Sequence, residues 1–230
     1  MKIHYCPYLS QFPSLKHAFF EATPKILSSN KNQAMQVMTG SPLPLQTLKQ
    51  VHGQDVIHIS KPCDKEKEGD GLVTNIKKIA LGIHTADCGP VLFYDPEAKV
   101  IGACHAGWRG AKKGILQESL NAMEKIGAKR SRIFATLGPT IQQSHYEVGP
   151  EFPELINDSY DTYFYPSERQ DHHYFNLPHY ICQQLLSENL AHVHDTKINT
   201  FTGNFSSRRR FLSEGMTWVH ADNLSAIAII

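Results

Sequence analysis

The chain of 230 residues is nearly neutral, with 23 lysine and arginine residues against 22 aspartate and glutamate residues. This balance gives no electrostatic reason to expect nucleic acid or an anionic membrane as a partner, because both require a concentrated basic surface. The N-terminus lacks the apolar segment of a secretory signal, and no run of about 18 apolar residues is long enough to span a membrane. Five scattered cysteines argue against a disulfide framework. We therefore expect a cytoplasmic protein.

The apolar pattern predicts helices and strands along most of the chain after the weakly patterned first 45 residues. Two amphipathic helices are expected at 111–126 and 180–189, and a shorter helix at 32–38. Apolar runs of strand length occur at 56–59, 79–83, 91–94, 100–103, 133–137 and 226–230. These elements do not alternate as regular βαβ units, and no linker interrupts them. We expect one α+β domain over residues 1–230, layered, with a mixed, largely antiparallel β-sheet and flanking helices.

A predicted hairpin brings two candidate metal ligands together. Asp95 and Pro96 begin a turn between two apolar runs. If Pro96 and Glu97 form a two-residue loop, Cys88 lies directly opposite His105 on the same face of the sheet. A register shifted by two residues would leave the pair as diagonal neighbours, whereas a shift by one would place them on opposite faces. A thiolate and an imidazole this close can bind one zinc ion.

The alternative interpretation is that Cys88 is a small buried side chain and His105 a histidine of the core. The small and turn-forming residues around both positions favour a site instead. His84 lies four residues before Cys88 and is a possible further ligand or base, whereas Cys104 alternates to the other face and is expected in the core. The pattern alone does not identify a third ligand.

Several motifs in this part of the chain resemble those of one known family. They are QVHG at 50–53, GDGLVT at 69–74, TADC at 85–88, HAGWRG at 105–110, LGP at 137–139, YEVG at 146–149 and FSSRR at 205–209. In this order they resemble the laccase-domain family, first described as multicopper polyphenol oxidases and now regarded as purine nucleoside phosphorylases. The resemblance implies that His52, Cys88 and His105 bind one zinc ion, with a fourth position for water or substrate.

Other residues are candidates for catalysis and substrate binding. Asp87 adjoins a predicted ligand and is expected to orient a ligand histidine or act as a general base, although in a regular strand it would point away from Cys88. Arg109 is expected to bind phosphate or ribose oxygens, and the alternative is a structural salt bridge. Trp108 either stacks on a purine or is an aromatic residue of the core that closes the hairpin. Arg208 and Arg209 either bind the anionic substrate or form an exposed basic turn.

The resemblance implies a zinc-dependent enzyme that cleaves adenosine, inosine, guanosine or S-methyl-5′-thioadenosine with phosphate and also deaminates adenosine. We expect purine nucleosides and phosphate as its partners, and a monomer or homodimer. One alternative is a copper-dependent polyphenol oxidase, but only His192 and His194 form a His-x-His pair of the kind that multicopper chemistry requires. The other alternative is a non-catalytic domain with a structural zinc, which would normally be closed by four protein ligands.

Overall fold

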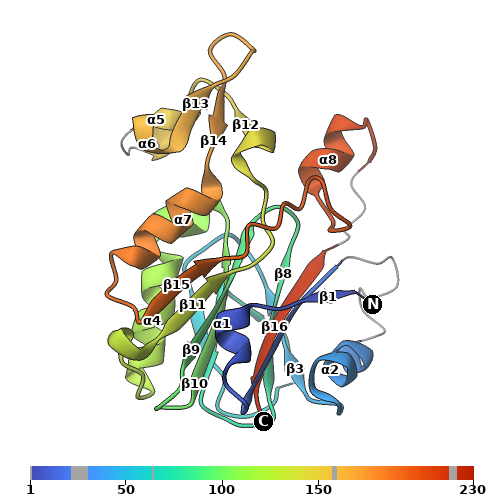
Figure 1. The fold of residues 1–230 in the computed structure, drawn as a ribbon, viewed down its shortest axis with the longest axis vertical. Coiled ribbons are helices and arrows are strands. Elements are labelled where there is room, and N and C mark those ends of the chain that lie inside the picture. Colours follow the sequence, from blue (N-terminus) through green and yellow to red (C-terminus); the bar gives the residue numbers. More distant parts are fainter. Residues whose placement is uncertain (1, 22–30, 64, 157–159, 218–221) are drawn as a thin grey trace.

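The computed structural model describes residues 2–21, 31–63, 65–156, 160–217 and 222–230. Two β-sheets form its centre, and helices lie on both sides of them (Figure 1). The expected α+β architecture with mixed, largely antiparallel strands is confirmed. The strands of the centre are divided between two sheets, so that the core has more layers than a single sheet with flanking helices.

The first sheet has five strands and joins the N-terminal and C-terminal parts of the described chain. Its order is β1 (Ile3–His4), β2 (Leu15–Phe20), β16 (Asn223–Ile229), β8 (Ala80–Thr85) and β3 (Leu45–Gln46). All neighbours are antiparallel except β3 and β8. Strand β2 was not predicted, because Lys16 and His17 interrupt its apolar pattern.

The second sheet has six strands and carries the predicted hairpin. Its order is β15 (His192–Asp195), β11 (Phe134–Leu137), β9 (Gly89–Asp95), β10 (Val100–Ala106), β7 (Gly71–Thr74) and β5 (Val56–His58). Strands β9 and β10 are buried along their whole length. Burial on both faces explains their continuous apolar runs. Strands β4 (Leu48–Lys49) and β6 (Lys67–Glu68) pair in parallel and form a separate sheet of two short strands.

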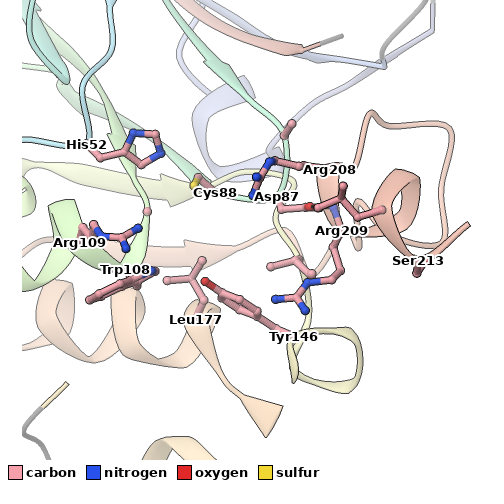
Figure 2. A pocket seen from close by; sticks show the side chains of 14 residues that line it. His52, Asp87, Cys88, Trp108, Arg109, Tyr146, Leu177, Arg208, Arg209 and Ser213 are labelled. Atoms are coloured by element: carbon pink, nitrogen blue, oxygen red, sulfur yellow. Dashed lines mark hydrogen bonds between the residues drawn. The ribbon is translucent and has the colours of Figure 1, made fainter. Parts of the chain in front are cut away.

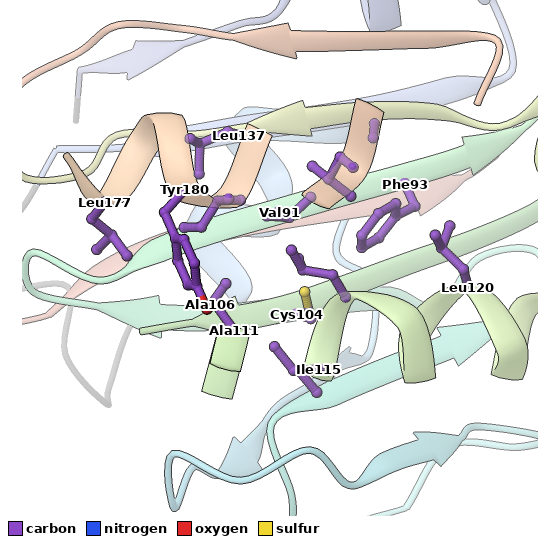
Figure 3. Close-up of a cluster of buried hydrophobic side chains, with 14 of the residues drawn as sticks. Val91, Phe93, Cys104, Ala106, Ala111, Ile115, Leu120, Leu137, Leu177 and Tyr180 are labelled. Carbon is purple, nitrogen blue, oxygen red and sulfur yellow. The ribbon is translucent and has the colours of Figure 1, made fainter. Parts of the chain in front are cut away.

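Side chains that alternate along the strands form separate hydrophobic layers. On β9, Leu92 and Tyr94 belong to the cluster between the two sheets, whereas Val91 and Phe93 belong to the cluster on the outer face of the six-stranded sheet (Figure 3). A third cluster covers the outer face of the five-stranded sheet beneath α2 (Lys31–Thr39). The order of layers is therefore helix, sheet, sheet and helices.

The helices on the six-stranded sheet differ from the prediction at their ends. The helix expected over 111–126 is divided into α3 (Trp108–Lys113) and α4 (Ile115–Lys125), because Gly114 between them has a left-handed φ of 99°. The helix expected over 180–189 is α7 (Leu177–Leu186), whose first turn is capped by the Asn176 side chain. Near the N-terminus, α1 (Pro7–Ser10) precedes β2.

A smaller unit projects from one end of the sandwich and was not predicted (Figure 1). Its three-stranded sheet, here called the cap sheet, has the order β12 (Glu147–Val148), β14 (His173–Phe175) and β13 (Phe164–Pro166). Helices α5 (Phe152–Ile156) and α6 (Tyr160–Tyr163) accompany it. Helix α8 (Arg208–Ser213) stands at the same end of the molecule. Single 3-10 turns occupy Arg130–Arg132 and Gln143–His145.

The helices of the described ranges are all too short or too polar to cross a bilayer. All five cysteines are free thiols.

Candidate metal centre and its cavity

Three side chains that the resemblance implies as metal ligands meet in the structure. The ligand atoms of His52, Cys88 and His105 all lie within 4.8 Å of one another. They come from the segment before β5, the segment between β8 and β9, and strand β10. Among the residues that the structure describes, no other group of three or more histidine, cysteine or acidic side chains is this close. His84 is not a member of the group, and its backbone is bonded to the Gln50 side chain.

The predicted register of the β9–β10 hairpin is wrong by two residues. His105 pairs with Pro90 rather than with Cys88, because the loop has four residues instead of two. The Asp95 carboxylate accepts two backbone N–H groups of this loop at 2.9 and 3.0 Å, and Lys99 closes it with a φ of 53°. A shift of two residues preserves the face, so Cys88 and His105 remain diagonal neighbours.

Close backbone approach at Gly107 leaves room for the thiol. A side-chain carbon at this position would lie 2.9 Å from the Cys88 sulfur and 3.4 Å from the His52 ring. Such a contact is far shorter than the separation of atoms in van der Waals contact, so any larger residue would displace the thiol or the ring. The glycine of the HAGWRG motif therefore has a steric role beside the centre.

The buried carboxylate of Asp70 fixes two of the three candidate ligands. Its Oδ1 accepts a hydrogen bond from His105 Nδ1 at 2.8 Å, which leaves His105 Nε2 available to a metal. The two oxygens of the carboxylate also accept the backbone N–H groups of Val51, His52 and Gly53 at 3.2, 3.0 and 2.6 Å. These bonds hold His52 in a left-handed conformation with a φ of 59°. The role of Asp70 was missed from the sequence, although the GDGLVT motif contains it.

The charges of the centre favour a metal-binding form of the cysteine. Burial raises the pKa of Cys88, but the positive charge of His105 and hydrogen bonds from His105 and His52 together lower it to about 6. Burial lowers the pKa of His105, whereas the Cys88 thiolate and the hydrogen bond to Asp70 raise it to about 9. The thiolate is the form of cysteine that binds metals. One thiolate and two imidazoles are a donor set that fits zinc.

The candidate centre opens into a cavity of about 570 Å³ (Figure 2). His52 and Cys88 face it, and its other walls combine aromatic, basic and aliphatic side chains. Its lining includes every sequence-predicted catalytic and substrate-binding residue, namely Asp87, Trp108, Arg109, Arg208 and Arg209, together with Tyr146 and Leu177, which were not predicted. The tertiary structure thus brings together segments that lie up to about 160 positions apart in the chain.

Two arginines of the cavity lie over aromatic rings. The Arg109 guanidinium is 4.3 Å from the centre of the Trp108 ring, and that of Arg209 is 5.4 Å from the Tyr146 ring. Neither these two nor Arg208 forms an ion pair with a carboxylate of the described chain. The alternative of a structural salt bridge for Arg109 therefore has no support among these residues. Uncompensated guanidinium groups in a cavity favour an anionic ligand.

Asp87 holds α8 against the cavity. Its two carboxylate oxygens accept hydrogen bonds from the Thr200 hydroxyl and from the Arg209 backbone N–H, both at 2.7 Å. Its carbonyl accepts the Thr140 hydroxyl at 2.7 Å and the Ile141 N–H at 3.0 Å. With a φ of 88°, Asp87 departs from strand geometry and faces the cavity. The carboxylate that bonds a candidate ligand histidine is Asp70, not Asp87.

Trp108 and Cys104 both contribute to the hydrophobic cluster on the outer face of the six-stranded sheet. Trp108 packs against Phe152 at a ring distance of 4.8 Å and also lines the cavity, and its stacking on a purine stays a prediction. Cys104 is fully buried in the outer cluster, as expected from alternation with His105. Burial raises the pKa of Cys104 to about 12, so this thiol remains protonated.

The fold and the site define an α+β protein with a three-residue group able to hold a metal beside a cationic cavity. Residues 17–219 match the family model described as multi-copper polyphenol oxidoreductase laccase, and the chain belongs to this family.

Two similar bacterial proteins are named purine nucleoside phosphorylase. The protein RC0672 of Rickettsia conorii is 32% identical over 170 residues, which are 71% of this chain and 69% of that protein. The relative from Deinococcus radiodurans is 48% identical over 104 residues, or 45% of this chain and 40% of the relative.

Solved structures confirm the fold. NMB0706 of Neisseria meningitidis has a TM-score of 0.77 at 24% identity and covers 94% of this chain and 95% of its own. YlmD of Geobacillus stearothermophilus has a TM-score of 0.81 at 20% identity, with coverages of 97% and 94%.

Proposed function

We propose that the chain is a cytoplasmic, zinc-dependent purine nucleoside phosphorylase of a single domain that also deaminates adenosine. Its nucleosides are adenosine, inosine, guanosine and S-methyl-5′-thioadenosine. The observation that carries the proposal is the opening of the His52, Cys88 and His105 group into a cavity with aromatic walls and unpaired arginines. The names of the relatives support the reaction class.

In this proposal His52, Cys88 and His105 hold the metal, and Asp70 orients the His105 ring toward it. A zinc ion held there supplies Lewis-acid polarisation of a substrate or water oxygen. Two of the three ligands face the cavity, which leaves an open side typical of a catalytic rather than a structural zinc.

Different walls of the cavity would bind different parts of the substrate. Trp108 and Tyr146 offer flat surfaces for a purine ring. Arg109, Arg208 and Arg209 supply the positive charge that a phosphate requires next to the ribose. Asp87 would contribute by holding the start of α8, which carries Arg208 and Arg209, since one of its carboxylate oxygens accepts the Arg209 N–H and the other accepts the Thr200 hydroxyl.

Copper at the same three residues is the alternative that the family description favours. Within the described residues His192 and His194 belong to no larger group of potential ligands, so a cluster of several copper ions has no second set of ligands there. Metal analysis of the purified protein separates the two assignments. About one zinc per chain supports the proposal, whereas several coppers per chain would support the oxidase.

The decisive experiment is a chromatographic product assay of the zinc-loaded protein with adenosine, with and without phosphate. Adenine formed only with phosphate shows phosphorolysis, and inosine formed without phosphate shows deamination. The Arg109→Ala variant is expected to lose about 10- to 150-fold in phosphate-dependent cleavage of inosine at low phosphate, because it removes a charge-assisted contact. Deamination should change much less. Absence of both products from the wild-type protein would refute the proposal.

Equal losses of both activities in Arg109→Ala would show that Arg109 binds the nucleoside instead of phosphate. The phosphate would then be assigned to Arg208 or Arg209. The matched control is Lys113→Ala, because Lys113 is an exposed cation on the same helix and lies outside the cavity lining.

A further inference from the structure

A second hollow adjoins the cavity on the side of the cap sheet. It has a volume of about 420 Å³ and shares Trp108, Arg109, Tyr146 and Arg209 with the first cavity. His52 and Cys88 line only the first cavity, and Arg169 and His172, from the β13–β14 turn, line only the second. The two hollows are therefore an inner compartment at the candidate centre and an outer compartment beneath the cap sheet.

The two arginine–aromatic pairs form the boundary between the compartments. Arg109 with Trp108 lies at the left of Figure 2, and Arg209 with Tyr146 lies at the right. Both guanidinium groups line both compartments. A ligand in either compartment can therefore contact them, and a ligand long enough to cross the boundary contacts both.

Positive charge exceeds negative charge around the outer compartment. Three guanidinium groups, of Arg109, Arg169 and Arg209, line it together with the carboxylates of Glu147 and Glu151. None of the three arginines forms an ion pair with a described acidic residue. Glu147 is instead hydrogen-bonded by the Ser167 hydroxyl. The guanidinium donors therefore remain available to an anion with several oxygen atoms.

We propose that the outer compartment is a phosphoryl-binding subsite, in which Arg169 acts together with Arg109 and Arg209. Its ligand is a phosphoryl group, carried either by inorganic phosphate or by the 5′ position of a purine nucleotide whose base and ribose occupy the inner compartment. Planar guanidinium groups match phosphate oxygens two at a time, which a lysine does not do. The inference rests on the proposed function for the choice of phosphate compounds.

The test measures binding to the zinc-loaded full chain by calorimetry at low ionic strength, with inorganic phosphate and adenosine 5′-monophosphate as separate probes. Arg169→Ala should weaken binding of at least one probe about tenfold. Arg169 is exposed and its side chain forms no hydrogen bond within the described chain, so the variant should fold normally. Weakening with phosphate alone identifies the free anion as the occupant, and weakening with the nucleotide alone identifies the 5′-phosphate.

Two further variants test whether binding depends on the sign and on the position of the charge. Glu151→Gln removes a negative charge from the same compartment and should bind the phosphoryl probe more tightly. Lys113→Ala removes a positive charge from the surface of α3 outside both compartments and should bind like the wild type within about twofold.

The inference would be overturned if the wild-type protein bound neither probe. It would also be overturned if Arg169→Ala bound both probes within about twofold of the wild type, or if Glu151→Gln bound the phosphoryl probe more weakly. Because binding is measured without turnover, its result is independent of the assay for nucleoside cleavage. An active phosphorylase with unaffected Arg169→Ala binding would refute this subsite alone. A protein that binds phosphate through Arg169 but cleaves no nucleoside would refute the proposed function alone.

Discussion

Asp70 shows how one buried side chain determines the geometry of a site from a distance in sequence. Its carboxylate joins β7 to the ring of His105 and to the backbone around His52, through four hydrogen bonds. Burial raises the pKa of Asp70, but hydrogen bonds from His105 and the backbone, together with the His105 charge, lower it to about 2. The group therefore stays ionised and accepts all four donors at once.

Asp70→Asn should lower the affinity for zinc about 10- to 100-fold, because the amide replaces one acceptor oxygen with a donor and the His105 ring loses its orientation. The affinity is measured by competition with a chromophoric chelator. Asp55→Asn is the matched control, since Asp55 is exposed and its backbone carbonyl, not its carboxylate, accepts hydrogen bonds from Asp70 and Gly71. Unchanged zinc affinity in folded Asp70→Asn protein would contradict the positioning role.

A substitution of Asp87 distinguishes a role in proton transfer from a role in positioning Arg209. Asp87→Ala should raise the Michaelis constant for phosphate at least about tenfold with little change in deamination, because it removes the acceptors of the Thr200 hydroxyl and of the Arg209 N–H. The measurement is the phosphate dependence of inosine cleavage beside the rate of adenosine deamination. A general base would behave differently: kcat would fall in both reactions and the acidic limb of the pH profile would disappear.

At the scale of elements, the strands and the short helices that join them hold the site in place. Strand β10 directs His105 toward the interior between the sheets and Cys104 toward the helices, so one strand serves both the centre and the core. Helix α1 is tied to strand β2 by the backbone N–H of Cys6, which donates to His17 Nε2 at 2.8 Å. Because His17 is titratable, we expect this contact to make the stability of the N-terminal elements depend on pH.

Burial lowers the pKa of His17 to about 4, against 6.5 in the unfolded chain, although the bond from Cys6 opposes the shift. The folded protein thus binds fewer protons than the unfolded chain between these values, and its full stability is present above pH 6.5. The free energy of unfolding should decrease by roughly 3 kcal/mol as the pH falls from 6.5 to 4.

The His17→Gln variant should not show this decrease in the free energy of unfolding at acidic pH, because the amide oxygen still accepts the Cys6 N–H but does not titrate. Urea unfolding at pH 7 and pH 4 measures the difference, with His58→Gln as a control at an exposed histidine. If His17→Gln loses as much stability as the wild type over this range, His17 is not the group responsible.

At the scale of the molecule, the candidate centre brings together segments that lie far apart in the sequence. Its residues come from three segments, and the Cys88 segment continues from the five-stranded sheet into the six-stranded sheet. A metal bound there would cross-link these segments only in the folded state. Ligands that bind only the folded state stabilise it by mass action.

Zinc at about 1,000 times its dissociation constant should therefore add about 4 kcal/mol to the stability. For a chain of this size each kcal/mol raises the melting temperature by about 2–4 °C. Calorimetric scans with zinc and with a chelator measure the shift. Cys88→Ser should lose it, whereas Cys63→Ser should keep it, because Cys63 is an exposed thiol away from the centre. Equal melting temperatures of the wild type under both conditions would argue against a metal site.

The sequence by itself determined the class of fold, most strands of the central sheets, and the face that Cys88 and His105 share. Alternation along a strand has a period of two, so these two side chains stay on one face even though the hairpin register is shifted by two residues. The motifs of the resemblance also supplied His52, and every predicted site residue lies at the candidate centre or its cavity.

Only the tertiary structure decided which polar groups meet. The contact of Asp70 with His105 spans 35 positions, and that of Asp87 with the Arg209 backbone spans 122. The cap sheet, with Arg169 on the outer compartment, could not be placed from its short, mixed-polarity strands. Local patterns record which side of an element is buried, whereas a hydrogen bond between distant segments depends on how the sheets and loops pack, and no local period records that.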